Sequence, residues 1–250
     1  MTCVRLFVKG MNRMFSATGA FAAFKWEALF RDWPVFVQGF AYTLLIAAGA
    51  LTLALVLGVI FGMFSTSSVS FLRVISRIFV EVFQNTPLLI QVFFLFNGLP
   101  LLGIILDVTT IGILGVGIYH GAYISEVVRS AIGSIKRGQF EAAYSQGFNY
   151  WQTMRYIILP QAQKIMLPPL TMQAVNLIKN TSVVAIISGA DIMFTAKSWS
   201  SGNIYYGPAY VAAGVLYFII CFPLATFAKR MEDNTKFAPV KEGKSAAAAR

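Results

Sequence analysis

Four consecutive polar residues, Lys179-Asn180-Thr181-Ser182, interrupt an otherwise apolar stretch of the sequence. An ammonium group in hydrocarbon is costly unless it faces a water-filled cavity, a counter-charge or a cluster of carbonyl oxygens. The amide and hydroxyl groups that follow it can donate and accept further hydrogen bonds. Two interpretations stay open: these residues line a polar path across a membrane, or they only bond to neighbouring helices.

Two other polar positions lie in apolar surroundings. Thr86-Pro87 would free backbone carbonyls inside a membrane-crossing segment, because proline lacks the N–H group that a helix uses. His120 is the single histidine of the chain. A hydrogen bond to another helix, or a place on a cavity wall, is favoured there over a metal-ligand role.

Catalytic and nucleotide-binding chemistry finds no support in the sequence. Cys3 and Cys221 lack the spacing of a disulfide or a metal site, and the carboxylates within apolar segments are scattered. The glycine-rich stretch 133–138 continues with Gln139 instead of Gly-Lys-Ser/Thr, so it is not a phosphate-binding loop. We therefore expect no enzyme activity, and no metal or cofactor bound by this chain.

A polar stretch between Arg129 and Lys164 has the pattern of a helix–turn–helix. We expect a first helix over Gln139–Gln146, a stop at Gly147, and a second helix over Tyr150–Ile158 that ends before Pro160. Glycine permits the positive φ of a helix end, and Pro160 would turn the chain back. The predicted shape is a rigid knob.

Composition and charge spacing identify the elements that must position these residues. Hydrophobic residues make up 57% of the 250 and charged residues only 12%, which is too little polar surface for a water-soluble domain of this size. A membrane-crossing helix needs about 20 apolar residues. The fold class is therefore an all-α integral membrane protein with five transmembrane helices, expected at Phe36–Phe64, Ile78–Phe96, Ile111–Val128, Ile165–Ser188 and Tyr210–Phe227.

Basic residues, which give the chain a net charge of +10, predict its orientation. They concentrate in residues 73–77, 129–164 and 229–250, and these segments are expected in the cytoplasm by the positive-inside rule, with no role for nucleic acid. Five spans then place the N-terminus outside and the C-terminus in the cytoplasm. The domains are a segment 1–35, a transmembrane domain 36–230 with its loop at about 130–164, and a polar cytoplasmic tail 231–250.

The N-terminal segment conflicts with this orientation, because five basic residues lie within residues 5–31. A surface-lying amphipathic segment, a weak signal-like sequence, or a translation start at Met14 instead of Met1 would each explain it.

Two short-range ion pairs are also expected, Arg77 with Glu81 and Glu126 with Arg129.

The loop resembles the EAA loop of the permease subunits of ATP-driven importers. Its seven anchor positions, at the spacing of that motif, are Glu141, Ala142, Ala143, Gly147, Ile157, Leu159 and Pro160. Four segments resemble the polar amino acid branch of this family, of the histidine, glutamine and glutamate permease type. They are 85–91, 123–129, 159–169 and 179–182. Gln84 stands where that branch usually has arginine. The resemblance covers about residues 37–230.

This resemblance implies the function and partners of the chain. The EAA loop would be a cytoplasmic coupling helix between the third and fourth spans that docks on an ATPase dimer, which binds ATP and Mg²⁺. The other partners would be an external amino-acid-binding protein, a second permease copy or homologue, and lipid of the cell (inner) membrane. The implied translocation path includes Thr86, Pro87, Gln91, Lys179, Asn180, Thr181 and Ser182.

The substrate would be a polar amino acid, with glutamate or glutamine favoured, since few carboxylates lie in the spans to meet a basic one. A stand-alone secondary transporter is the alternative, although neither ion-coupling groups nor paired inverted repeats are evident. Asp191 lies beyond the fourth span, where a solvated charge is favoured over a contact with the binding protein.

Overall fold

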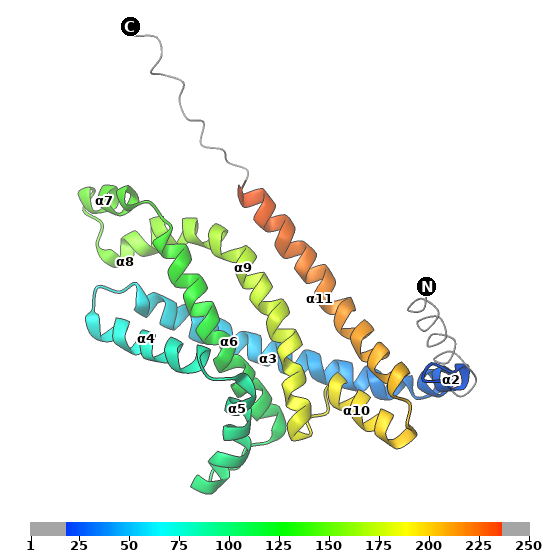
Figure 1. Cartoon of the computed structure of the whole chain (residues 1–250). Helices are drawn as coiled ribbons and strands as arrows, with labels where there is room; N and C mark the ends of the chain where they lie inside the picture. Colours follow the sequence, from blue (N-terminus) through cyan, green and yellow to red (C-terminus); the bar gives the residue numbers. More distant parts are fainter. Residues whose placement is uncertain (1–18, 237–250) are drawn as a thin grey trace, which may run out of the picture.

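The computed structural model describes residues 19–236, and these residues form an all-helical bundle without strands (Figure 1). The long helices are α3 (Trp33–Ser65), α4 (Ser70–Gln84), α6 (Val108–Gly133), α9 (Leu159–Asn180) and α11 (Tyr206–Lys236). The shorter ones are α2 (Ala23–Arg31), α5 (Leu88–Phe93), α7 (Arg137–Ser145), α8 (Tyr150–Thr153) and α10 (Ile192–Asn203). Four short segments are π-helical or 3₁₀: η1 (Phe94–Gly98), η2 (Leu99–Leu102), η3 (Met154–Ile158) and η4 (Thr181–Ile187).

Four helical segments in this part of the chain are long and apolar enough to cross a membrane. They are Trp33–Ser65, Val108–Gly133, Tyr150–Ile187 and Tyr206–Asp233, and a bent pair, Ser70–Gln84 with Leu88–Leu102, makes a fifth if it counts as one span. Helices α7 and α8 lie at one end of the bundle, and α2 and α10 lie at the other (Figure 1). We refer to these as the α7 end and the α10 end.

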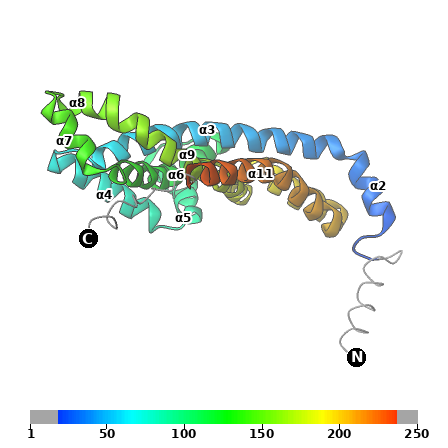
Figure 2. The same ribbon diagram turned by 90° about the horizontal axis from the view of Figure 1, so that it is seen from above.

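Small residues let α3 and α6 pack closely. Ala50, Ala54, Gly58 and Gly62 recur every four residues along α3 and are buried, which is the small-residue pattern that brings membrane helices into contact. A Cβ atom at Gly58 would collide with the side chain of Ile124 on α6. Figure 2 shows α3 along one side of the bundle, with α2 turning away at its end. This pair forms the frame against which α4 and α9 pack.

The second expected span does not form one continuous helix. Instead of crossing over Ile78–Phe96, the chain bends by 96° between α4 and α5. Pro87 precedes α5 as its N-cap, in an extended conformation with φ −56° and ψ 134°. Its missing N–H, together with the steric restriction on Thr86 before it, ends α4 here. We call this bend the elbow.

The fourth expected span is also longer than predicted, because the helix does not end before Pro160. Residues Tyr150–Ile187 form one continuous segment. A π-helical turn, η3, leads into α9, where Pro160 occupies a first-turn position whose N–H needs no helical partner. Pro168 and Pro169 lie inside α9 without breaking it. The polar cluster at residues 179–182 therefore marks a change from α-helix to the 3₁₀ turn η4.

The remaining differences concern the ends of the chain. Helix α11 runs to Lys236, so the first residues of the expected polar tail are helical, and α10 lies between the fourth and fifth expected spans. Of the N-terminal segment, α2 is described, but Cys3, Met14 and the basic residues up to Arg13 lie outside the described residues. The three explanations for that segment stay predictions.

Candidate functional site

A polar groove runs along the bundle, built from four pockets that share residues. The pocket nearest the α10 end shares Lys179 with the next one, which shares Tyr123 and Gln173 with a third. The third pocket shares Glu126 and Arg129 with the last one, which lies at the α7 end. Their volumes, in that order, are about 300, 380, 470 and 560 Å³. The groove therefore extends over the length of the bundle, with walls from α4, α6, α9 and α11.

Lys179 stands where the two pockets nearest the α10 end meet. Its side chain is exposed, and its ammonium has no ion-pair partner within residues 19–236. The following residues differ in placement: Asn180 and Ser182 line the groove, whereas the Thr181 hydroxyl is buried and donates to the Ile178 carbonyl at 2.8 Å. The two pockets nearest the α10 end thus offer one cation and several hydrogen-bonding groups.

His120 connects two helices at this site. Asn180 Nδ2 donates to His120 Nε2 at 3.0 Å, which assigns the imidazole proton to Nδ1, and Nδ1 then donates to Gln173 Oε1 at 3.3 Å. His120 is only 2% exposed. The expected role as an interhelical hydrogen-bonding group is confirmed, and within residues 19–236 no group of acidic, histidine and cysteine side chains could hold a metal ion.

The other predicted path residues lie at the elbow. The Gln91 amide donates to the carbonyls of Phe83 and Thr86, both at 3.0 Å, and so satisfies groups that the break at Pro87 leaves without helical partners. The Thr86 hydroxyl donates to the Val82 carbonyl at 2.8 Å. Thr86 and Gln91 line a separate apolar pocket of about 440 Å³, which shares no residue with the groove. Thr86 and Gln91 therefore line a different pocket from Lys179.

The knob at the α7 end has the expected helix–turn–helix form. Gly147 has a φ of +81°, as predicted. The N–H of Phe148 bonds to the Ala143 carbonyl at 3.1 Å and that of Gly147 to the Tyr144 carbonyl at 2.9 Å, which is the Schellman pattern of a glycine-terminated helix. Asn149 and Gln152 then form a capping box that starts α8. Local sequence therefore determines the shape of this turn.

The seven loop positions divide between the surface and the interior. Glu141 is exposed and pairs with Arg137 at 3.5 Å, and Ala142 and Pro160 are exposed as well. Ala143 is buried, and Ile157 and Leu159 pack against the hydrophobic core. The sequence interpretation missed the large aromatic side chains exposed on this end, Tyr144, Trp151 and Tyr156. Their aromatic type, in a loop expected to face water, is a signal that could have identified them.

The expectations for the charged residues hold for one ion pair and fail for the other and for Asp191. Glu126 and Arg129 form the predicted ion pair, at 2.6 Å, but the expected pair of Arg77 with Glu81 is absent from the described part of the chain. Asp191 is fully buried, not solvated as expected. It caps α10 by accepting the N–H of Phe194 at 2.9 Å, and it accepts the Tyr217 hydroxyl at 3.3 Å. Burial raises the pKa of its carboxyl to about 6.

These features define a class: a multi-pass membrane protein with a polar groove along its spans and a helical knob at one end. Comparison with known proteins gives the family. The model of the family described as binding-protein-dependent transport system inner membrane component matches residues 54–236. This chain belongs to that family, and it is a permease subunit of an amino acid ABC importer.

Individual relatives support the assignment. The "Probable glutamine ABC transporter permease protein GlnM" of Bacillus subtilis is 37% identical over 206 residues, which are 82% of this chain and 95% of the relative. The glutamine transport system permease protein GlnP of Escherichia coli is 33% identical, over 85% of this chain and 98% of the relative. A chain of the crystal structure of an amino acid ABC transporter with histidines has a TM-score of 0.77 at 28% identity, covering 83% of this chain and 97% of that one.

Proposed function

We propose that this permease receives glutamine, or a closely similar polar amino acid, from an external binding protein and releases it into the cytoplasm. ATP with Mg²⁺ would be bound and hydrolysed by an ATPase dimer on separate chains. A second permease copy or homologue would cover the groove. The relatives named as glutamine permeases support this substrate, and the unpaired Lys179 in the groove would attract its carboxylate.

The proposed orientation places the α7 end in the cytoplasm and the α10 end outside, in the cell (inner) membrane. The basic residues support it, since Lys136, Arg137, Arg155 and Lys164 all belong to the α7 end. The knob would then dock on the ATPase through Glu141, Ala142 and the exposed aromatic residues around them.

One observation carries the proposal: a single helical segment links the knob to the groove. The segment Tyr150–Ile187 begins beside the turn at Gly147 and includes Lys179 near its other end. Gln161 Nε2 also donates to Gln139 Oε1 at 3.2 Å and so joins α9 to α7. A displacement of the knob by a partner would therefore reach Lys179 through continuous helix.

Affinity purification in mild detergent tests the coupling role. An ATPase should copurify with the wild-type chain and be lost from Glu141→Lys and Gly147→Asp. The matched control is Glu27→Lys, an exposed residue of α2 at the opposite end, which should retain the ATPase. If no ATPase copurifies with the wild-type chain under any condition, the proposed coupling to a separate ATPase through the knob is wrong.

Uptake into proteoliposomes tests the substrate. Labelled glutamine should enter in an ATP-dependent way when the binding protein is present, and unlabelled glutamine should compete better than arginine. Equal competition by arginine would contradict the proposed substrate class without affecting the permease assignment.

A further inference from the structure

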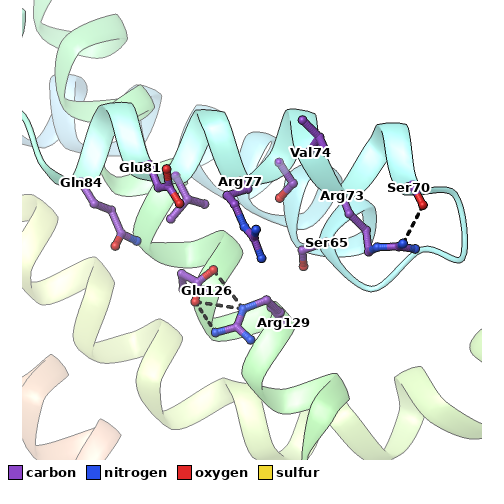
Figure 3. Close-up of a pocket in the computed structure, with 11 residues that line it drawn as sticks. Ser65, Ser70, Arg73, Val74, Arg77, Glu81, Gln84, Glu126 and Arg129 are labelled. Carbon is purple, nitrogen blue, oxygen red and sulfur yellow. Dashed lines mark hydrogen bonds and ion pairs between the residues drawn. The ribbon is translucent and has the colours of Figure 1, made fainter.

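The pocket at the α7 end of the groove carries charges of both signs (Figure 3). Its volume of about 560 Å³ falls within the range of small-molecule sites. Helix α4 contributes Arg73, Arg77 and Glu81, and helix α6 contributes Glu126 and Arg129. We call this cavity the mouth pocket.

Three of these five charges are already engaged. Arg129 donates to both carboxylate oxygens of Glu126, with distances from 2.6 to 3.0 Å. Arg73 donates to the carbonyls of Ser67 and Ser68, both at 2.8 Å, and also to Ser70. These bonds hold the Arg73 guanidinium beside the turn between α3 and α4. The ion pair between Arg129 and Glu126 leaves the charge of Glu126 balanced.

Arg77 and Glu81 are the two charged side chains that stay unengaged. Neither forms a side-chain hydrogen bond or ion pair within residues 19–236, although they lie one turn apart on α4. Figure 3 shows the Arg77 guanidinium extending from α4 towards Glu126 and Arg129, while Glu81 lies further along the same helix. The wall of the mouth pocket thus presents one available cation and one available carboxylate.

A free amino acid has the matching pair of charges. Its carboxylate would accept two parallel hydrogen bonds from the fork of a guanidinium, and its ammonium would donate to a carboxylate. A simple anion would leave the available carboxylate without a partner. The charge pattern therefore favours a zwitterion.

The mouth pocket also lies on the route from Lys179 to the α7 end. The intervening pocket shares Gln84, Glu126 and Arg129 with it, and shares Tyr123 and Gln173 with the pocket of Lys179. A solute that moves along the groove reaches Arg77 and Glu81 last. We propose that Arg77 and Glu81 form a second binding station, where the substrate amino acid is held at the cytoplasmic mouth. This inference rests on the proposed function.

Equilibrium binding of labelled glutamine tests the station. The permease–ATPase complex is placed in nanodiscs made only of phosphatidylcholine and titrated without nucleotide. The wild-type complex should bind two glutamines per permease chain. Arg77→Gln should weaken one site at least about tenfold, since a charge-assisted pair is lost, and Lys179→Gln should weaken the other. Arg230→Gln, an exposed arginine of α11 that lines none of the four pockets, should keep both.

A double variant with reversed charges controls for loss of assembly in the single variants. Arg77→Glu combined with Glu81→Arg keeps one charge of each sign on the exposed face of α4, and it should recover the second site that Arg77→Glu alone loses. If the reversed pair assembles but does not recover the site, the two residues do not bind the zwitterion.

Other outcomes separate this inference from the proposed function. One glutamine per wild-type chain, lost in Lys179→Gln and unchanged in Arg77→Gln, would overturn the second station and leave the permease proposal intact. No glutamine bound and no ATPase copurified would overturn both. Native mass spectrometry of the complex from cell membranes distinguishes a lipid: phosphatidylethanolamine that is lost in Arg77→Gln, with glutamine binding unchanged, would show that the pocket holds a headgroup instead.

Discussion

His120 holds Asn180 at the wall of the groove through a hydrogen bond between Nε2 and the Asn180 amide. Because Nδ2 of Asn180 is used in this bond, its Oδ1 stays available to accept a hydrogen bond from a solute. Gln173 fixes the other side of the ring. In the proposed function, the imidazole would therefore be a positioning group that need not touch the substrate.

We expect His120→Phe to lower glutamine uptake about tenfold, because the loss of an orienting hydrogen bond costs about 1–1.5 kcal/mol. The ATPase should still copurify, since His120 is remote from the knob. His120→Asn, which can retain one of the two bonds, should give an intermediate rate. Uptake at the wild-type rate in His120→Phe would show that Asn180 needs no support.

The buried Asp191 makes stability depend on pH. Its folded-state pKa of about 6 lies above the ordinary value of 3.8, so the folded protein binds this proton more tightly than the unfolded chain does. Stability should therefore fall as pH rises from about 4 to 6, by about 3 kcal/mol in total. In Asp191→Asn, which can still cap α10, this part of the pH dependence should be absent from thermal unfolding in detergent. An identical pH profile in both proteins would contradict it.

Sequence reasoning succeeded at Gly147, whose surroundings are local, and failed at Asp191, whose partners are distant in the sequence. Gly147 was recognised because its helix, turn and following cap all lie within residues 137–152. Asp191 was not, because its partner Tyr217 is 26 positions away and the neighbouring Ile192 N–H bonds to Thr43, 149 positions away. A carboxylate beyond an apolar span looks solvated until those helices are placed.

Among the elements, the proline of the elbow and those of the segment Tyr150–Ile187 have opposite effects. Pro87 accompanies a 96° bend, whereas Pro160, Pro168 and Pro169 lie within one helical segment. Proline removes an N–H in every case, but its place differs: Pro87 lies between two helices as the N-cap of α5, whereas Pro160 lies in the first turn of α9, where an N–H needs no helical partner. At the elbow, Gln91 satisfies the carbonyls that the break frees. The number of apolar segments was therefore predictable, but the bend was not.

Close packing of α3 on α6 should make Gly58 intolerant of any side chain. Gly58→Ala should lower the thermal unfolding temperature in detergent, because its Cβ would collide with Ile124. Gly202→Ala on α10 is the matched control: nothing lies near its Cβ, and alanine is favoured over glycine in a helix by up to about 1 kcal/mol. The two variants should shift stability in opposite directions. A shift in the same direction would refute the packing argument.

At the scale of the whole molecule, the groove is an open face that carries polar and charged side chains. Cysteine labelling in a cysteine-free background distinguishes this face from lipid-facing surfaces. Ser182→Cys, in the groove, should react with a membrane-impermeant maleimide, because the reagent and the thiolate both need water. Ile219→Cys, on α11 and 56% exposed but lining none of the groove pockets, should not react in proteoliposomes. Equal labelling at both positions would mean that the groove is not a distinct aqueous surface.

The open groove should also affect the half-life of a newly synthesised chain. Until another surface covers it, Lys179 would border acyl chains, and a charge near the bilayer centre carries a penalty of several kcal/mol. A single copy therefore has a higher free energy than a copy whose groove is covered by another subunit. Orphan copies should accordingly be short-lived in the cell, cleared by membrane proteolysis, and their half-life should lengthen when the rest of the assembly is synthesised beside them.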